Sequence, residues 1–477
     1  MACAVGFAVP LYANASALSS ASQLLNARPD SAVCSSSSQS QLRNESSTPF
    51  QIAPSRSQFI GAAVSFRHAT ARRHASLSPD LEFTIKAQSV ATESRPKVGP
   101  AAIKNGTKAK LIFEDGTVFE GISFGSEKSV NGEAVFTTGM CGYPETLTDA
   151  SYRGQILVLT YPEIGNYGVP ADGVDQYGVP VFESDRIHVA ALVVRNYVEK
   201  YSHFQATRSL SDWLIENDIP AIYGVDTRAL TKKIRETGAL LAKIQFGDDE
   251  VEFADPNDRN LVAEVSTKEI KTYKPANPVL NKEGKPLKLV AVDCGMKNNM
   301  IRIFLELGAE LTVVPWDFDF TTLEYDGLFV SNGPGNPQVC TPTIENLKKA
   351  LKMDKPVFGI CLGNQLLSLA SGAKTYKLKF GNRGQNQPCV DVTTGKAYIT
   401  VQNHGFAVDN DSLAEGWEPY FVNASDNTSE GIRNKTKPFF SVQFHPESTA
   451  GPKDAEILFK LFIAVIQGSV PWPPTSS

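Results

Sequence analysis

The chain has 477 residues, more than one domain usually contains, and its 42% hydrophobic and 20% charged residues are ordinary for a soluble globular protein. A net charge of −5 and a pI near 5.8 argue against a nucleic-acid binder, and no apolar run approaches the roughly 18 residues needed to span a membrane. Seven scattered cysteines form no Cys-x-x-Cys pair or metal-ligand spacing, so we expect no metal site and a reducing compartment.

Residues 1–79 differ from the rest of the chain. They are dense in Ser and Ala and contain six Arg, no Lys and two acids, Asp30 and Glu45. This composition is typical of an organellar transit peptide, with cleavage expected between about 50 and 100, and a general disordered leader is the alternative. The start has no basic region, which disfavours a secretory signal, and an uncharged, Ser- and Ala-rich start favours the chloroplast stroma over the mitochondrion.

From Ala109 the composition becomes globular. Two strands and the Asp115-Gly116 turn between them predict a hairpin over residues 110–122. Further strands are expected over 155–161 and 188–195, and helices over 209–217 and 226–237. We predict one mixed α/β domain over residues 109–265, followed by a polar, Pro- and Lys-rich linker over 266–287.

The second predicted domain, residues 288–468, alternates strands with helices. The expected strands cover 289–293, 310–315, 327–330 and 357–360, and the expected helices cover 297–307, 341–353, 363–371 and 454–467. This order predicts an open, mostly parallel sheet with helices on both faces. Ligands bind such sheets at the carboxyl ends of the strands.

Two of these strands end in residues suited to catalysis. The strand before Ser331 is followed by a loop rich in Gly and Pro, Ser331–Pro337, which can hold backbone N–H groups in place as an oxyanion hole requires. The next strand ends at Cys361, between Gly359 and Gly363, at the spacing of the Gly-x-nucleophile-x-Gly elbow. The following helix would stabilise a thiolate with its N-terminus.

A base and an orienting acid follow downstream. Residues 439–444 predict a strand that ends in His445-Pro446-Glu447, where the proline prevents continuation. An imidazole can take the proton of a cysteine, and a carboxylate can fix the tautomer of the imidazole. The candidate triad is therefore Cys361, His445 and Glu447. His404, in a polar loop, is the alternative base, but it has no Glu two residues later.

The Gly-rich loop, the cysteine elbow and the His-Pro-Glu end together resemble the class I glutamine amidotransferases. The stretch 132–168 and the run Gly224–Arg228 resemble the N-terminal domain of the small, glutaminase subunit of carbamoyl-phosphate synthase. The resemblance covers about residues 109–468. It implies an N-terminal mixed α/β domain followed by a class I amidotransferase domain that hydrolyses glutamine through a glutamyl thioester.

The resemblance also implies a glutamine site. Its residues would be Ser151, Gly333, Gly335, Leu362, Gln365, Asn403, Gly405 and Phe406. Asn364 and the run Asn382–Gln387 depart from histidine-containing positions of many relatives, which leaves the role of that loop open.

The resemblance implies a partner, a large synthetase subunit that uses ATP, Mg and bicarbonate and receives ammonia through a channel, for arginine and pyrimidine biosynthesis. This chain has no Gly-x-x-x-x-Gly-Lys-Ser/Thr motif, so we expect no cofactor of its own. Two other interpretations stay open: a catalytically inactive regulatory subunit, and the glutaminase of another synthase, such as those for anthranilate or GMP.

Overall fold

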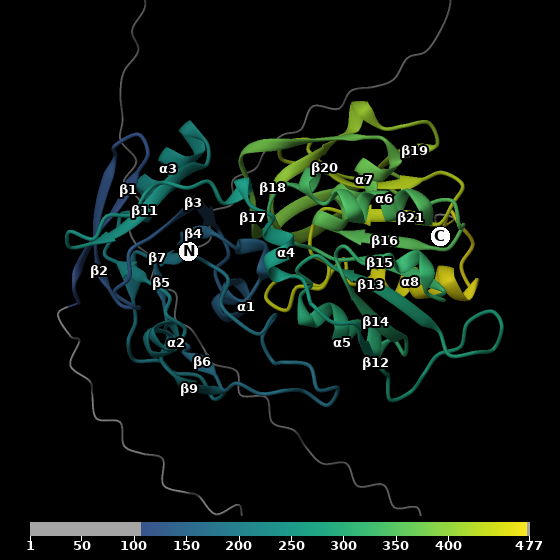
Figure 1. Ribbon diagram of the computed structural model, residues 1–477, viewed down its shortest axis with the longest axis horizontal. Helices are drawn as coiled ribbons and strands as arrows, with labels where there is room; N and C mark the ends of the chain where they lie inside the picture. Colours follow the sequence, from purple (N-terminus) through teal and green to yellow (C-terminus); the bar gives the residue numbers. More distant parts are fainter. Residues whose placement is uncertain (1–105, 475–477) are drawn as a thin grey trace, which may run out of the picture. The chain divides into compact units, whose positions relative to one another are not determined.

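The computed structural model describes residues 106–474, in which a barrel domain is followed by an open-sheet domain (Figure 1). The predicted leader, residues 1–79, lies outside the described residues. No helix in the described part of the chain is long and apolar enough to cross a bilayer.

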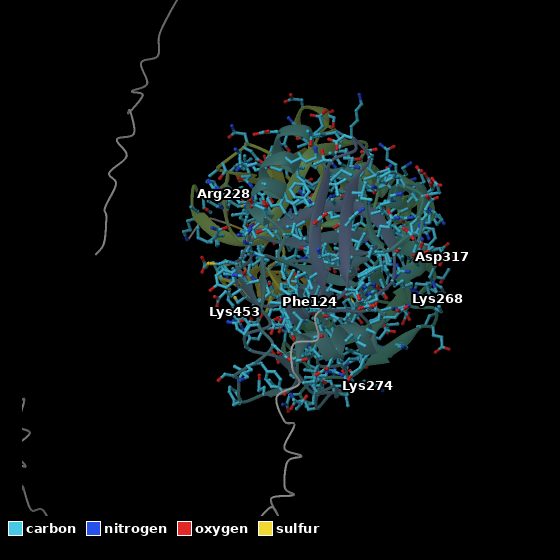
Figure 2. All side chains as sticks on the ribbon, turned by 90° about the vertical axis from the view of Figure 1, so that its left-hand side faces the viewer. Phe124, Arg228, Lys268, Lys274, Asp317 and Lys453 are labelled. Carbon is cyan, nitrogen blue, oxygen red and sulfur yellow. The ribbon has the colours of Figure 1, made fainter. Side chains whose placement is uncertain are left out.

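A closed barrel of seven strands forms the first domain, in the order β1-β11-β3-β4-β7-β10-β2. The strands are β1 (Lys108–Phe113), β2 (Val118–Ser123), β3 (Val130–Thr137), β4 (Gln155–Leu159), β7 (Ala191–Val193), β10 (Ala221–Tyr223) and β11 (Leu240–Phe246). Around them lie α1 (Tyr143–Leu147), α2 (Leu210–Glu216), α3 (Thr227–Thr237), and the short pairs β5 (Glu163–Ile164) with β8 (Asn196–Tyr197) and β6 (Val169–Pro170) with β9 (Ala206–Arg208). Figure 2 views the molecule from this side, with Arg228 of α3 at its edge.

The open-sheet domain contains ten strands in the order β12-β14-β13-β15-β16-β21-β20-β19-β17-β18. Five adjacent strands pair in parallel: β14 (Glu310–Pro315), β13 (Lys288–Asp293), β15 (Gly327–Val330), β16 (Val357–Ile360) and β21 (Phe439–Val442). The antiparallel strands are β12 (Lys271–Tyr273), β17 (Lys374–Asp391), β18 (Ala397–Asp409), β19 (Trp417–Asn423) and β20 (Ser429–Asn434). The predicted α/β class is confirmed.

Helices cover both faces of the parallel strands because their buried side chains alternate. Leu289 and Ala291 pack with α5 (Asn298–Glu306) and α8 (Ile457–Gln467). Val290 and Val292 face the other way and pack with α6 (Thr341–Ala350) and α7 (Leu362–Ser371). This alternation follows from the two-residue period of a strand. It leaves the carboxyl ends of β13, β15, β16 and β21 together at one edge.

The predicted linker is only partly a linker. Lys271–Tyr273 forms strand β12, which pairs antiparallel with β14 and becomes the edge of the large sheet. Before it, α4 (Leu261–Val265) packs Val262 into the core of the open-sheet domain. The exposed Lys268 and Lys274 flank this edge strand on the surface (Figure 2). The connection therefore belongs to the second domain, because an unpaired β14 edge accepts the extended chain.

Candidate active site

Cys361 occupies the strained turn between β16 and α7. Its backbone has φ 55° and ψ −103°, a conformation that a residue with a side chain rarely adopts. A Cβ on Gly359 would lie 2.6 Å from the carbonyl oxygen of Gly363, and one on Gly363 would lie 2.1 Å from that of Val330. Both flanking glycines are thus required by close backbone contact, and the strain is held by the surrounding sheet.

The cysteine is less accessible than the elbow pattern predicted. Its side chain is 2% exposed, and its Sγ lies 3.6 Å from the carbonyl oxygen of Asn403 in β18. The β17–β18 hairpin contributes to this burial through Asn403. A substrate must therefore reach the sulfur through the pocket that Cys361 lines.

His445 and Glu447 lie together just after β21. His445 Nδ1 is 2.7 Å from Glu447 Oε1, and both residues are 1% exposed. Burial and the charge of Lys297 oppose protonation of His445, but Glu447 and Cys361 outweigh them and raise its pKa to about 10. The imidazole is therefore protonated at neutral pH, with Nδ1–H donating to Glu447.

The opposite ring nitrogen is available for chemistry. His445 Nε2 is buried and has no hydrogen-bond partner at normal geometry among residues 106–474. The interaction with Cys361 that raises the pKa of His445 requires the thiol and imidazole to be close. The structure thus brings the three predicted catalytic residues together from two different strand ends.

His404 is placed differently. Its Nδ1 is 2.9 Å from the carbonyl oxygen of Phe406, and its Nε2 is 3.3 Å from Gln402 Oε1 and 3.8 Å from Glu430 Oε1. Each ring nitrogen faces an acceptor, so neither is free to take a proton from a thiol. The geometry favours His445 as the base.

A pocket of about 520 Å³ opens beside the cysteine, at the boundary of the two domains. Seven of the eight residues predicted to bind glutamine line it: Ser151, Gly333, Gly335, Gln365, Asn403, Gly405 and Phe406. Leu362 is the exception, since its side chain is buried in the core and it can offer only its N–H. That N–H belongs to the first residue of α7, next to the sulfur.

Hydrogen bonds fix the walls of this pocket. The Ser151 hydroxyl accepts a bond of 2.9 Å from Asn332 Nδ2, which joins the barrel domain to the loop after β15. Gln365 Nε2 donates to the carbonyl oxygen of Phe406 at 3.0 Å and to Gln443 Oε1 at 3.1 Å. The pocket is therefore shaped before any ligand binds.

Lys297 is a site residue that the sequence analysis missed. Its Nζ lies 3.1 Å from Glu447 Oε1 and 3.4 Å from Asp149 Oδ2, and the side chain is 9% exposed. Burial opposes its charge, but Asp149, Glu447 and Glu183 outweigh burial and raise its pKa. A lysine just beyond a predicted strand, at the ligand-binding edge of the sheet, was the available signal.

The same lysine sets the charge state of the carboxylates. Burial disfavours ionisation of Asp149 and Glu447, but the nearby charges of Lys297 and His445 outweigh it and lower the pKa of both. Lys297 Nζ is also 3.3 Å from His445 Nδ1, a contact between two donors that is repulsive when the imidazole is charged. Glu447 thus contacts two cations, Lys297 and the His445 imidazolium. Asp149 of the barrel domain is the second anion beside Lys297.

Glu183 is another buried carboxyl of the barrel domain at this boundary. It accepts hydrogen bonds from the N–H of Asn299 at 3.1 Å and from Thr449 Oγ1 at 3.3 Å. Burial is the main cause that raises its pKa to about 7, against the charge of Lys297. It connects the start of α5, next to Lys297, with the segment that follows Glu447.

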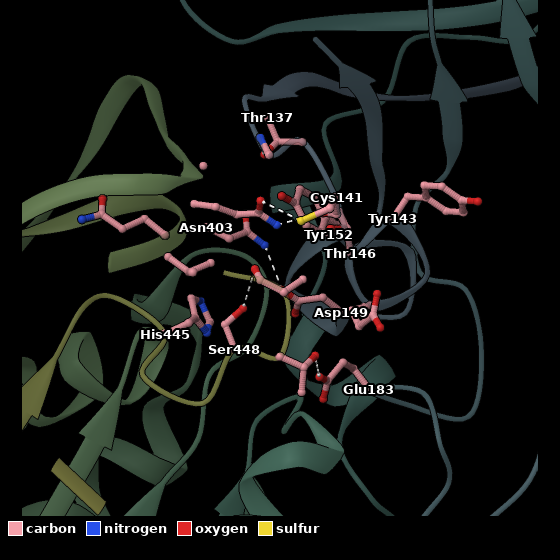
Figure 3. A pocket seen from close by; sticks show the side chains of 18 of the residues that line it. Thr137, Cys141, Tyr143, Thr146, Asp149, Tyr152, Glu183, Asn403, His445 and Ser448 are labelled. Atoms are coloured by element: carbon pink, nitrogen blue, oxygen red, sulfur yellow. Dashed lines mark hydrogen bonds between the residues drawn. The ribbon is translucent and has the colours of Figure 1, made fainter. Parts of the chain in front are cut away.

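A second pocket, of about 640 Å³, lies on the imidazole side of the site. Asp149, Glu183, Asn403 and His445 are among its lining residues, and Figure 3 shows them around it. Cys361 lines the first pocket and His445 the second, while Asn403 lines both. Cys361 and His445 therefore lie between two pockets, each lining one of them.

The departures from the family pattern have structural roles. Asn364 is fully buried, donates to Gln443 Oε1 at 3.0 Å and accepts from Ser441 Oγ at 2.8 Å, directly behind the elbow. Gln385 Nε2 donates to the carbonyl oxygen of Cys141 at 2.8 Å, across the domain boundary. The run Asn382–Gln387 therefore docks the β17–β18 hairpin on the barrel domain.

Residues 111–244 match the carbamoyl-phosphate synthase small chain, CPSase domain family, and residues 290–465 match the glutamine amidotransferase class-I family. The chain therefore carries a carbamoyl-phosphate synthase small-chain domain followed by a class I glutamine amidotransferase domain. Its second domain is a class I glutamine amidotransferase domain, as the sequence predicted.

The relatives that this chain matches are much longer. The multifunctional protein pyr-3 of Neurospora crassa is 52% identical over 384 residues, which cover 75% of this chain and 21% of that protein. The mitochondrial carbamoyl-phosphate synthase (ammonia) of Homo sapiens is 51% identical over 378 residues, covering 78% of this chain and 24% of that protein. The chain spans a quarter or less of the length of these relatives. A solved glutamine amidotransferase from Thermotoga maritima is 18% identical, covers 38% of this chain and 91% of its own, and has a TM-score of 0.29.

Proposed function

We propose that this chain is the glutaminase subunit of a glutamine-dependent carbamoyl-phosphate synthase. One observation carries the proposal: a strained cysteine lies beside a buried imidazolium whose other nitrogen is fixed by a carboxylate. This arrangement supplies a nucleophile, a proton donor and an orienting group for acyl transfer. The match to the carbamoyl-phosphate synthase small-chain domain supports carbamoyl phosphate as the compound that receives the released ammonia.

In the first half-reaction, the Cys361 thiolate attacks the side-chain amide carbon of glutamine. The N–H groups of Leu362 and Gly333 stabilise the oxyanion, and one good donor contributes about 3 kcal/mol. When the C–N bond breaks, His445 gives its proton to the leaving nitrogen, which departs as ammonia. A glutamyl thioester and a neutral His445 remain.

In the second half-reaction, the neutral imidazole takes a proton from water, and the resulting hydroxide attacks the thioester. Glutamate leaves, the thiolate is regenerated, and His445 is again protonated. Glu447 stabilises the imidazolium in both steps. The pocket on the imidazole side gives ammonia a way out that does not cross the glutamine pocket.

The partner in this proposal is a separate large synthetase subunit, which forms a heterodimer with this chain and uses ATP, Mg and bicarbonate. The matched relatives carry this segment within longer chains, which supports a physical connection between the two activities. The product would enter arginine and pyrimidine biosynthesis. The Ser- and Ala-rich leader supports import into the chloroplast stroma.

The human relative is named for ammonia as its nitrogen source, which gives one alternative to glutamine hydrolysis. An inactive regulatory subunit would also keep the fold. The complete Cys361, His445 and Glu447 arrangement supports glutamine hydrolysis over both alternatives.

The test is to copurify the chain with its partner and assay carbamoyl phosphate from glutamine and from ammonium salts. Cys361→Ser should abolish the glutamine-dependent reaction and keep the ammonium-dependent one, because a hydroxyl is too weak a nucleophile here. Cys389→Ser is the control. The buried Cys389 thiol is hydrogen-bonded with Thr400 Oγ1 at 3.3 Å, and Cys389 lines neither pocket. Equal loss with both nitrogen sources in Cys361→Ser would refute the proposal. Copurification with the partner of another synthase would instead indicate the glutaminase of that synthase.

The proposed localisation in the chloroplast stroma has a separate test. A chain lacking residues 1 to about 60 should be active in solution but remain in the cytosol of a plastid-bearing cell. A tagged full-length chain that stays cytosolic would contradict the stromal assignment.

A further inference from the structure

Arg383 is a buried cation that contacts no anion among residues 106–474. It lies in β17, opposite Asn403 in β18, and is 6% exposed. Its Nη1 donates to the carbonyl oxygen of Phe380 at 2.9 Å, while its Nε is buried and has no partner among the residues the structure describes. Within that part of the chain, no carboxylate forms an ion pair with the guanidinium. Several strong donors are therefore left unused.

This arrangement is costly for the protein alone. Burial lowers the pKa of Arg383, and the more distant Glu133, followed by Tyr152 and Cys361, only partly opposes that effect. A buried charge without a partner usually has a functional explanation, because desolvation is not repaid by a contact. The missing partner would be an anion that enters from outside.

The guanidinium lines the same pocket as Cys361 and the predicted glutamine-binding segment. Its Nη2 lies 3.4 Å from the position that a Cβ on Gly405 would take, so the glycine leaves this face uncovered. Lys377 also lines the pocket, but its Nζ is 2.7 Å from Glu133 Oε1 and is already neutralised. Arg383 is thus the better candidate for a bound anion.

Free glutamine carries such an anion. Its α-carboxylate stays charged at neutral pH, and the planar fork of an arginine matches the two oxygens of a carboxylate. We propose that Arg383 binds the α-carboxylate of glutamine and makes the site select the free amino acid over glutamine whose carboxylate is blocked as an amide. This inference rests on the proposed glutaminase function and adds a residue that sets substrate specificity.

The experiment combines one substitution with one change in the substrate. Ammonia release by the full chain is measured with L-glutamine and with L-glutamine α-amide, in wild type and in Arg383→Gln. The variant should raise KM for glutamine about 10- to 100-fold, the range of one charge-assisted contact, with a smaller change in kcat. KM for the α-amide should change less than about 2-fold, and Arg383→Lys should restore part of the glutamine affinity.

Arg433→Gln is the matched control. Arg433 lies in β20 of the same sheet and pairs with Glu418 at 2.8 Å, outside both pockets. It should leave the preference for glutamine over the α-amide unchanged. An Arg383→Gln variant that loses the same factor with both substrates would overturn the proposal, because the arginine would then support the thiolate or the fold.

Binding separates this inference from the proposed function. Calorimetry on the Cys361→Ser chain needs no turnover, and glutamine should bind more tightly than the α-amide only when Arg383 is present. If wild type releases no ammonia but this binding difference is found, the proposed function fails and the carboxylate site stands. If wild type is active and Arg383→Gln changes neither KM nor binding, the carboxylate site fails alone.

Discussion

Replacing Lys297 with methionine removes a cation shared by buried carboxylates of both domains. Methionine has a similar length and no charge, so the change removes the 3.1 Å contact to Glu447 and the 3.4 Å contact to Asp149 while largely keeping volume. Both carboxylates are at least 97% buried and would lose their nearest positive charge on that side.

The expected loss of unfolding free energy is about 3 to 5 kcal/mol at pH 8, the usual result of removing one partner of a buried pair. This is a large share of the roughly 5 to 15 kcal/mol that stabilises a folded domain. In wild type, Lys297 helps to lower the pKa of Asp149 and Glu447, so their stabilisation is present above the unfolded value near 4 and is lost as pH falls. Without the lysine, these carboxyls should take up protons at higher pH, and the penalty should shrink towards pH 5.

Urea unfolding of wild type, Lys297→Met and the Lys297→Met/Asp149→Asn double variant at pH 8 and pH 5 measures this effect. The double variant should be less destabilised than the sum of the two single variants, because it removes one charge of each sign. A loss below about 1 kcal/mol at pH 8, or an equal loss at both pH values, would refute the reasoning.

Two further predictions concern Glu183 and His445. The stability of Glu183→Gln relative to wild type should improve by about 3 kcal/mol between pH 4.5 and pH 7.5, because a buried carboxyl with its pKa raised to about 7 loses stability over that range, whereas an amide does not titrate. Parallel stability curves would contradict this. His445→Asn should accumulate a glutamyl adduct on Cys361, visible as a mass increase of the intact protein, and should lack the fall in stability that wild type shows between pH 6.5 and 10, since the pKa of His445 is raised to about 10. Full turnover in the His445→Asn variant would show that another residue is the base.

Local signals in the sequence predicted the elements that position the nucleophile. The apolar run before Cys361 and the helical spacing after it correspond to β16 and α7, with the cysteine at the junction. The helix expected over 226–237 corresponds to α3, where Asp226 accepts bonds from the N–H groups of Arg228 and Ala229 and Gly238 follows the last helical residue. These features depend on backbone geometry within a few residues, which a sequence expresses directly.

The antiparallel half of the large sheet was not predicted. Strands β17 and β18 mix charged, polar and apolar residues and are interrupted by register shifts between Lys377 and Asn382 and between Gly384 and Gln387. Such strands have no regular period of two, so the pattern fails. The same holds for β12, whose three largely exposed residues form a strand only because β14 is beside them.

The charged groups around the triad were determined by tertiary structure alone. Asp149 and Glu183 come from the barrel domain, Lys297 from the start of α5, and Arg383 from a long hairpin, so no local spacing connects them. Sequence motifs identified Cys361 because a strained turn requires glycines next to it. A buried charge has no such local requirement, since its neighbours are chosen by burial and by the docking of the two domains.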